Sequence, residues 1–170
     1  ALQSAHARRR ALELALPAAF AENQLEVWFQ SQIDFSTNQV VCLEALIRWR
    51  HPEHGIIRPD EFVPLIERSG NGGRLGALVV EGACIALKRL AAAGRSDIRI
   101  AINLSASELT DHSFARKLQA LCTLHDVPVS SLEIEITEGS LINNMSNALG
   151  VLSSMRAMGA ALSEDIGACR

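Results

Sequence analysis

Short apolar runs alternate along the chain with longer segments in which apolar residues recur every three or four positions. The short runs, rich in Val, Ile and Leu, are typical of buried strands, and the periodic segments are typical of amphipathic helices. The pattern predicts strands at residues 25–35, 40–49, 98–104 and 132–137, and a fifth that starts at residues 160–163. It predicts helices at residues 7–23, 60–69, 75–93, 113–125 and 145–158, and a proline-containing loop at residues 51–59. This alternation favours an α/β fold with a parallel sheet.

The distance between successive strand ends is nearly constant, which indicates repeating strand–helix units. From Asn103 to Glu135 is 135 − 103 = 32 positions, and from Glu135 to Asp165 is 165 − 135 = 30. This period suits a TIM-like (β/α)8 barrel, which typically has about 250 residues. We therefore expect a partial barrel of about five strands at residues 24–170, with residues 1–23 as an N-terminal helix or a link from an upstream domain.

Composition narrows the environment of the protein and the classes of partner. Hydrophobic residues make up 48% of the 170 residues and aromatic residues only 4%, so the core must be aliphatic. The net charge of −3 argues against duplex nucleic acid as a partner, although a metal ion would let the domain bind a small anion. No apolar run reaches the roughly 18 residues of a membrane span, and the four scattered cysteines indicate buried free thiols. We expect a cytoplasmic domain; an upstream membrane anchor in a longer parent protein stays open.

Oxygen-bearing side chains end four of the short extended runs. They are Glu44, Asn103, Glu135 and the adjacent Glu164 and Asp165. The carboxyl ends of the strands meet at one end of a βα barrel, so these side chains are expected to converge. Converging carboxylates repel each other unless a cation lies between them, and oxygen donors without His or Cys favour Mg²⁺ or Mn²⁺. The alternative for each residue is an acidic side chain that faces solvent or caps the next helix, so this pattern alone indicates a metal site without a substrate.

Four ordered motifs resemble those of one protein family. Residues 44–52 (EALIRWRHP) resemble the signature EALxRWxHP, and residues 59–67 (PDEFVPLIE) resemble PxxFIPLAE. Residues 103–105 match NLS, and residues 135–138 match EITE. The tripeptide EAL alone would be uninformative, but the ordered set is specific. Over nearly its whole length the chain thus resembles the N-terminal five-eighths of the EAL domain of bacterial cyclic-di-GMP phosphodiesterases.

The resemblance implies a truncated barrel domain, with a first strand that can run in reverse, from an enzyme that hydrolyses cyclic-di-GMP to linear pGpG with two Mg²⁺ or Mn²⁺ ions. By matching position, it implies metal ligands at Glu44, Asn103, Glu135, Glu164 and Asp165; substrate contacts at Gln30, Arg48 and Glu67; and Glu138 as the residue that steadies the loop after the fourth strand. For Glu67 a simple helix-terminal charge is an equal alternative. An upstream GGDEF or sensory domain is a common companion of this family, and a homodimer stays open.

The resemblance is incomplete at several positions. The family's general-base lysine is expected beyond residue 170, and the only lysines of the chain, Lys88 and Lys117, lie in predicted helices. Ser31 and Cys42 replace a usual proline and glycine, and Glu164 replaces the first aspartate of a DDFG motif. Two alternatives to the phosphodiesterase therefore stay open, namely a degenerate EAL domain that binds cyclic-di-GMP without cleaving it and a protein-interaction module. The 170 residues alone are expected to be inactive.

Strand parity gives a further expectation about the interior of the barrel. If Asn103 and Glu135 point inward, Arg99 and Glu133 must also point inward, because alternate residues of a strand share a face. Buried charges need partners, so we expect these two side chains to pair with each other or with nearby charges. His51 is expected to be structural rather than a ligand, because it lies beside Pro52 in a loop. The chain's tryptophans, Trp28 and Trp49, are expected to pack rather than to stack on a base.

Overall fold

The computed structural model describes residues 2–165 of the chain, and the side chains of residues 6–136 and 148–163. A six-stranded sheet runs through the molecule in the order β1-β2-β4-β5-β6, with β3 paired to the other side of part of β2. The strands are β1 (Leu25–Asp34), β2 (Gln39–His51), β3 (Gly55–Ile57), β4 (Arg99–Leu104), β5 (Leu132–Thr137) and β6 (Ala161–Asp165). The pairings from β2 through β6 along this order are parallel, whereas β1 and β3 run antiparallel to β2.

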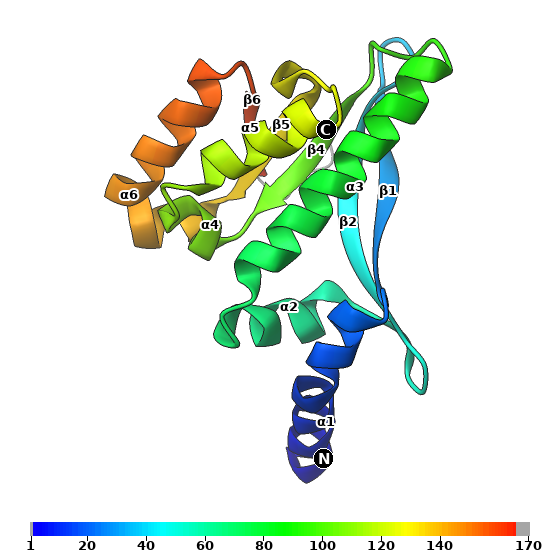
Figure 1. Ribbon diagram of the computed structural model, residues 1–170, viewed down its shortest axis with the longest axis vertical. Coiled ribbons are helices and arrows are strands. Elements are labelled where there is room, and N and C mark those ends of the chain that lie inside the picture. The colour runs from blue at the N-terminus through cyan, green and yellow to red at the C-terminus, as the bar shows by residue number, and fades with distance from the viewer. Residues whose placement is uncertain (1, 166–170) are drawn as a thin grey trace.

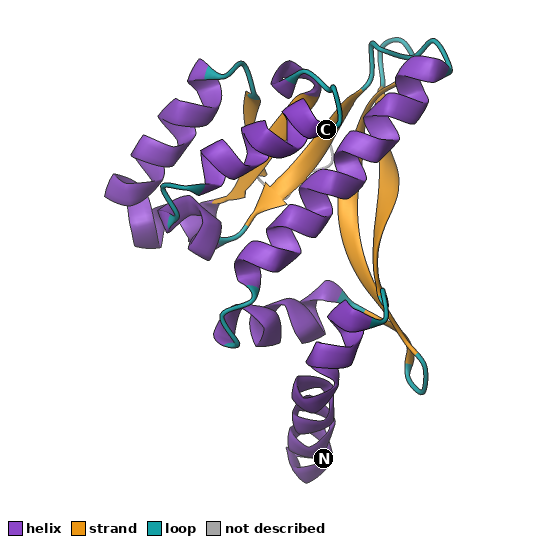
Figure 2. Ribbon diagram, in the orientation of Figure 1, coloured by secondary structure: helices purple, strands orange, loops and turns teal. Residues whose placement is uncertain are grey.

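The five predicted strands and the α/β class are confirmed, and so is the reversed first strand (Figure 2). The short strand β3 was not predicted, because it lies within the expected loop at residues 51–59. Gly55 has φ of +67°, a left-handed conformation that glycine adopts without strain, and the chain turns there so that His51 pairs with Gly55. A three-residue strand after such a turn is too short to give an alternating pattern.

Helices lie along one face of the sheet, except the first helix, which extends away from one end of it (Figure 1). They are α1 (Leu2–Ala21), α2 (Pro59–Arg68), α3 (Gly72–Ala92), α4 (Ala106–Thr110), α5 (Phe114–Leu124) and α6 (Glu138–Ala157), with a 3-10 turn at Val129–Ser131. Five of the six were predicted, but α6 begins at Glu138 rather than at residue 145. Its first turns contain Gly139, Ser140 and Asn143, which are poor helix formers and hide the helical pattern.

Alternate residues of the central strands face two different environments. Ile100, Ile102 and Leu104 of β4 are buried in the main core beneath α3, α5 and α6. Arg99 and Asn103, which alternate with them, are exposed on the opposite face. The helix-covered face therefore supplies the apolar core, and the other face of the sheet carries the polar residues that the sequence singled out.

A second core joins α1 and α2 to the β1–β2 hairpin, around the completely buried Trp49. The Trp49 ring meets Phe62 edge-on at 5.7 Å between ring centroids, and Leu12 of α1 closes the cluster. The predicted packing role is thus confirmed for Trp49. It is wrong for Trp28, which is 43% exposed because it lies opposite Leu46 on the polar face of the edge strand β1.

Candidate metal centre

Glu44, Asn103 and Glu135 lie on three neighbouring strands at one end of the sheet. The Asn103 amide donates from Nδ2 to Glu44 Oε1 over 2.8 Å, although 59 positions separate the two residues. Asn103 is paired directly with Glu135 in the parallel β4–β5 ladder, and neighbouring strands lie about 4.8 Å apart. Because directly paired residues share a face, the three predicted metal ligands are brought together on the polar face.

The predicted layer of paired charges lies one step below these residues. Arg99 Nη2 and Glu133 Oε2 are 3.2 Å apart, and only 16% of the Glu133 side chain is exposed. This ion pair between β4 and β5 is the one that strand parity predicts. The positive charge of Arg99 neutralises Glu133, so Glu133 adds no unpaired negative charge beside the carboxylates above it.

Cys42 fills the same layer on β2, paired with Arg99 across the β2–β4 ladder. Burial, together with the negative charges of Glu133 and Glu135, raises the pKa of its thiol to about 11. The thiol is therefore neutral at physiological pH and adds no thiolate to the polar face. Cys84 and Cys122 are also buried free thiols. The prediction of buried free thiols is thus confirmed for the three cysteines that the structure describes.

The remaining predicted metal ligands lie on β6. The backbone pairs Asp165 with Thr137 and Glu164 with Ile136, so the two acidic residues take alternate positions on the strand. Glu138 is the first residue of α6 and follows β5 directly, without an intervening loop. The side chains of Glu138, Glu164 and Asp165 lie outside the described residues, and their predicted roles stay predictions.

Gln30 and Arg48 flank the carboxylates on the β1–β2 hairpin. Gln30 is exposed and lies directly opposite Glu44 in the antiparallel ladder. The half-buried Arg48 is four residues after Glu44 and therefore has the same parity on β2. Its Nη1 donates to the carbonyl oxygen of Ile47 over 2.9 Å, which uses one of the five guanidinium N–H donors. These two predicted substrate contacts thus lie on the same face as the candidate metal ligands.

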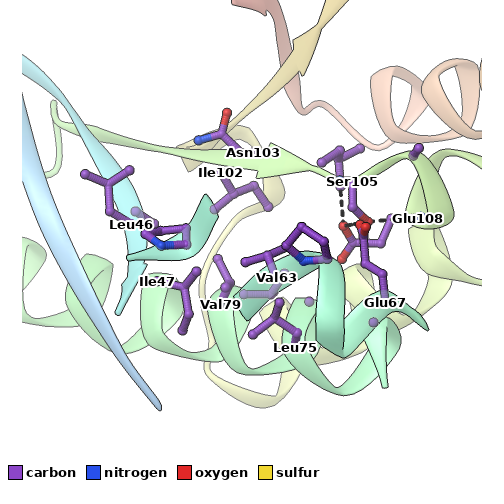
Figure 3. Close-up of a pocket in the computed structure, with 18 of the residues that line it drawn as sticks. Leu46, Ile47, Val63, Glu67, Leu75, Val79, Ile102, Asn103, Ser105 and Glu108 are labelled. Carbon is purple, nitrogen blue, oxygen red and sulfur yellow. Dashed lines mark hydrogen bonds between the residues drawn. The ribbon is translucent and has the colours of Figure 1, made fainter. Parts of the chain in front are cut away.

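A cavity of about 510 Å³ adjoins this site, between α2, α3 and the carboxyl ends of β2 and β4. Its walls include Leu46, Asn103 and Glu67 (Figure 3). Asn103 and Ile102 project from opposite sides of β4, and Ile102 points among the apolar residues of the cavity. Glu67 is half-buried in the cavity wall, one residue before the end of α2, so both alternatives for its role stay compatible with its position.

Glu108 is a second carboxyl group in this cavity, and the motif comparison did not single it out. Its Oε2 accepts hydrogen bonds from Ser105 N and Ser105 Oγ, over 2.8 and 2.7 Å, in a capping box at the start of α4. Burial raises the pKa of Glu108, and the negative charge of Glu67 raises it further. The spacing Ser-x-x-Glu is a readable signal for such a box.

His51 has the structural role that its position predicted. It is 91% buried, as only 9% of it is exposed, and its Nδ1 accepts hydrogen bonds from the backbone N–H groups of Glu53 and His54. The ring therefore stabilises the turn between β2 and β3 through these hydrogen bonds. Burial lowers the pKa of His51, which fits a neutral ring with an unprotonated Nδ1.

The donor set fits a hard divalent cation. Glu44 and Glu135 supply carboxylate oxygens, and the Asn103 amide, whose nitrogen faces Glu44, keeps its oxygen as a further donor. Among the side chains that the structure describes, no three His, Cys, Asp or Glu residues are grouped as a metal site. A two-carboxylate centre with an amide between them is what the described part of the chain provides.

Comparison with known proteins identifies the family. The model of the EAL domain matches residues 13–167. The chain is 34% identical over 154 residues to the cyclic di-GMP phosphodiesterase NbdA of Pseudomonas aeruginosa, covering 91% of this chain and 20% of NbdA. It is 36% identical over 144 residues to the cyclic di-GMP phosphodiesterase PA2567 of the same organism, covering 85% of this chain and 24% of that protein. The chain thus spans about a quarter or less of these relatives.

Solved structures agree with the sequence comparison. The PaMucR phosphodiesterase in complex with c-di-GMP superimposes with a TM-score of 0.87 and 30% identity, covering 92% of this chain and 64% of that one. The EAL enzyme Bd1971 in its cAMP- and cyclic-di-GMP-bound form gives a TM-score of 0.83 at 25% identity, with 95% and 45% covered. The fold is therefore a partial EAL-type barrel. Separately, no helix among the described residues is long and apolar enough to cross a membrane. The chain belongs to the EAL domain family.

Proposed function

We propose that this chain forms the N-terminal part of a cyclic-di-GMP phosphodiesterase domain, which hydrolyses cyclic-di-GMP to linear pGpG. The observation that carries the proposal is the meeting of Glu44, Asn103 and Glu135 on one face of three adjacent strands. The same three residues lie in the EAL, NLS and EITE motifs. The relatives of this chain include cyclic di-GMP phosphodiesterases.

The metal centre would be held by Glu44, Asn103 and Glu135, with Glu164 and Asp165 as proposed ligands from β6. Phosphodiesterases of this family depend on divalent metal ions, and we propose Mg²⁺ or Mn²⁺, two per complete domain, because the donors are oxygens. Such ions activate a water molecule and stabilise the leaving oxygen of a phosphodiester. The protein's own contribution is to fix the donors: the 2.8 Å bond from Asn103 holds the Glu44 carboxylate in place.

The substrate would lie along the face that carries Gln30 and Arg48, and Glu67 would contact it from the wall of the adjoining cavity. The Arg48 guanidinium suits a phosphate oxygen of the dinucleotide because it offers several N–H donors in one plane. Glu138 is proposed to steady the segment after β5. The general-base lysine is proposed in the part of the domain that this chain does not span, since Lys117 is paired with Asp111 on the outer helices and Lys88 lies within α3.

The biological setting is proposed from the relatives. The bifunctional diguanylate cyclase/cyclic di-GMP phosphodiesterase MucR of Pseudomonas aeruginosa is 31% identical over 164 residues, and LapD of Vibrio cholerae has a solved S helix-GGDEF-EAL unit with this fold. We propose an upstream GGDEF or sensory domain that joins at residues 1–23, a cytoplasmic location, and a homodimer as one assembly of the parent protein.

The experiment that tests the proposed function joins this chain to the C-terminal part of the PaMucR domain that it does not cover. The chimera is expected to convert cyclic-di-GMP to pGpG with Mg²⁺ or Mn²⁺. Chromatography of the products measures this conversion. Glu44→Ala should abolish turnover, because it removes a metal ligand. Ser31→Ala, on the opposite face of β1, is the matched control and should leave turnover unchanged.

The same experiment separates the alternatives. If the chimera binds cyclic-di-GMP but forms no pGpG, the domain is a non-hydrolytic receptor. If it neither binds nor hydrolyses the dinucleotide, the protein-interaction alternative gains and the phosphodiesterase proposal fails.

A further inference from the structure

One hydrogen bond crosses the polar face of the sheet from its edge to its centre. Gln32 Nε2 on β1 donates to Glu135 Oε1 on β5 over 3.3 Å. The two residues are 103 positions apart, and β2 and β4 lie between their strands in the sheet. The sheet therefore curls enough for its edge strand to reach a proposed metal ligand across the barrel interior. Neither the motif comparison nor the strand-end pattern assigns a role to Gln32.

The backbone explains why Gln32 points there. Gln32 is paired with Cys42, one alternation beyond the pair of Gln30 with Glu44, so both glutamines lie on the polar face. A β-bulge follows directly, because Ile33 is paired with Val40 and one residue of β2 is skipped. Bulges increase the local twist of a strand and redirect its side chains. The bulge beside Gln32 thus turns this end of β1 over the interior.

The chemistry of the contact suits a carboxylate that must bind a cation. An amide N–H bonded to Oε1 restricts rotation of the Glu135 carboxylate. A neutral donor orients the carboxylate without cancelling its charge, whereas a Lys or Arg at this place would compete with the cation.

We propose that Gln32 is a positioning residue of the metal centre, which orients Glu135 for a divalent cation. The inference rests on the proposed function, because it takes Glu135 as a metal ligand. Hydrogen-bond partners of metal ligands commonly contribute about 10- to 100-fold to metal affinity. Gln32 acts through Glu135 and needs no contact with the substrate.

The test measures Mn²⁺ affinity of the 170-residue chain by isothermal titration calorimetry, with Mn²⁺ itself as the probe. Gln32→Met keeps the length of the side chain but removes the N–H donor, and it is expected to weaken Mn²⁺ binding by about 10- to 100-fold with an unchanged Tm. Gln39→Met makes the same change at an exposed position of the same hairpin and should bind Mn²⁺ like the parent. Glu135→Ala defines the signal that belongs to this site.

If Gln32→Met lowers the Tm, a second variant tests the positioning role of Gln32. Gln32→Lys keeps a donor and an apolar stem but adds a positive charge beside Glu135, so it is expected to weaken Mn²⁺ binding in a salt-dependent way. Parent-like Mn²⁺ affinity in both Gln32 variants would overturn the positioning role and leave the proposed function standing. A parent chain whose Mn²⁺ binding is absent or insensitive to Glu135→Ala would instead overturn the metal centre, and the positioning role with it.

Discussion

At the scale of single residues, His51 shows how a polar side chain in a signature motif serves the fold. Its Nδ1 accepts from two backbone N–H groups, which requires that this nitrogen carry no proton. Burial is the largest cause that lowers the pKa of His51; the charges of His54 and Arg8 lower it further, and Glu53 opposes them. Protonation would therefore break the turn between β2 and β3.

This arrangement predicts an acid-sensitive stability. The folded pKa of His51 lies below its ordinary value of about 6.5, so the unfolded chain binds the proton more tightly. The contribution of His51 is fully present above pH of about 6.5 and is lost as the pH falls through the folded pKa. Between pH 7.5 and pH 5.5 the parent chain should lose free energy of unfolding, and His51→Asn should lose less. The Asn side-chain oxygen can still accept a hydrogen bond in the turn. Urea denaturation at the two pH values measures both losses. His6→Asn, at an exposed position of α1, should keep the parental pH dependence; equal losses in the parent and His51→Asn would contradict this role.

Local and long-range contacts differ in how far the sequence predicts them. Glu44, Asn103 and Glu135 could be predicted as one group because strand parity is a local property. Asn103 and Glu135 lie near the carboxyl ends of β4 and β5 as expected, whereas Glu44 lies in the middle of β2, which continues to His51. The Arg99–Glu133 pair follows from the same parity. Gln32 could not be assigned, because its bond to Glu135 depends on the curl of the whole sheet and on a bulge that no local pattern indicates.

At the scale of elements, the close fit of α3 against α4 fixes the segment that follows Asn103. Ser105 caps α4, and the Glu108 side chain of this capping box extends to Gly76 of α3. A Cβ atom at Gly76 would overlap Glu108 Oε1 and lie 3.2 Å from Phe114 Cε2. Helix α4 was missed in the sequence because five residues give no helical periodicity, although the capping box itself is local.

A pair of glycine substitutions tests this fit. Gly76→Ala should lower the free energy of unfolding by about 1–3 kcal/mol, because overpacking must displace the buried Glu108. Gly73→Ala lies on the same helix with no atom within 4 Å of the added Cβ, and should raise stability by up to about 1 kcal/mol. Urea denaturation measures both. In a Glu108→Ala background the cost of Gly76→Ala should largely disappear; an undiminished cost there would show that Glu108 is not the obstacle.

At the scale of the whole molecule, the sheet is an arc with β1 at one edge and β6 at the other. The arc was predictable from the repeat of about 31 residues, since that spacing already matched part of a barrel of about 250 residues. The chain covers 64% of the PaMucR phosphodiesterase structure, and the proposed metal ligands Glu44 and Asn103 meet on the polar face of the arc. Exposed apolar side chains on and beside β1, Phe29, Ile33 and Phe35, add to the surface that this arc presents to solvent.

The 170-residue polypeptide, when expressed alone, is therefore predicted to self-associate and to show no hydrolysis of cyclic-di-GMP with Mg²⁺ or Mn²⁺. Unpaired strand edges and exposed apolar residues promote association, which light scattering after size-exclusion chromatography would detect. Turnover needs the metals, a positioned water and the substrate groove together, and Lys88 and Lys117 lie on helices rather than on the polar face. When the same residues are joined to the C-terminal part of the PaMucR domain, the protein should self-associate less and should hydrolyse cyclic-di-GMP. Formation of pGpG by the isolated monomeric chain would contradict this prediction, because the residues on the polar face of the arc would then suffice for hydrolysis.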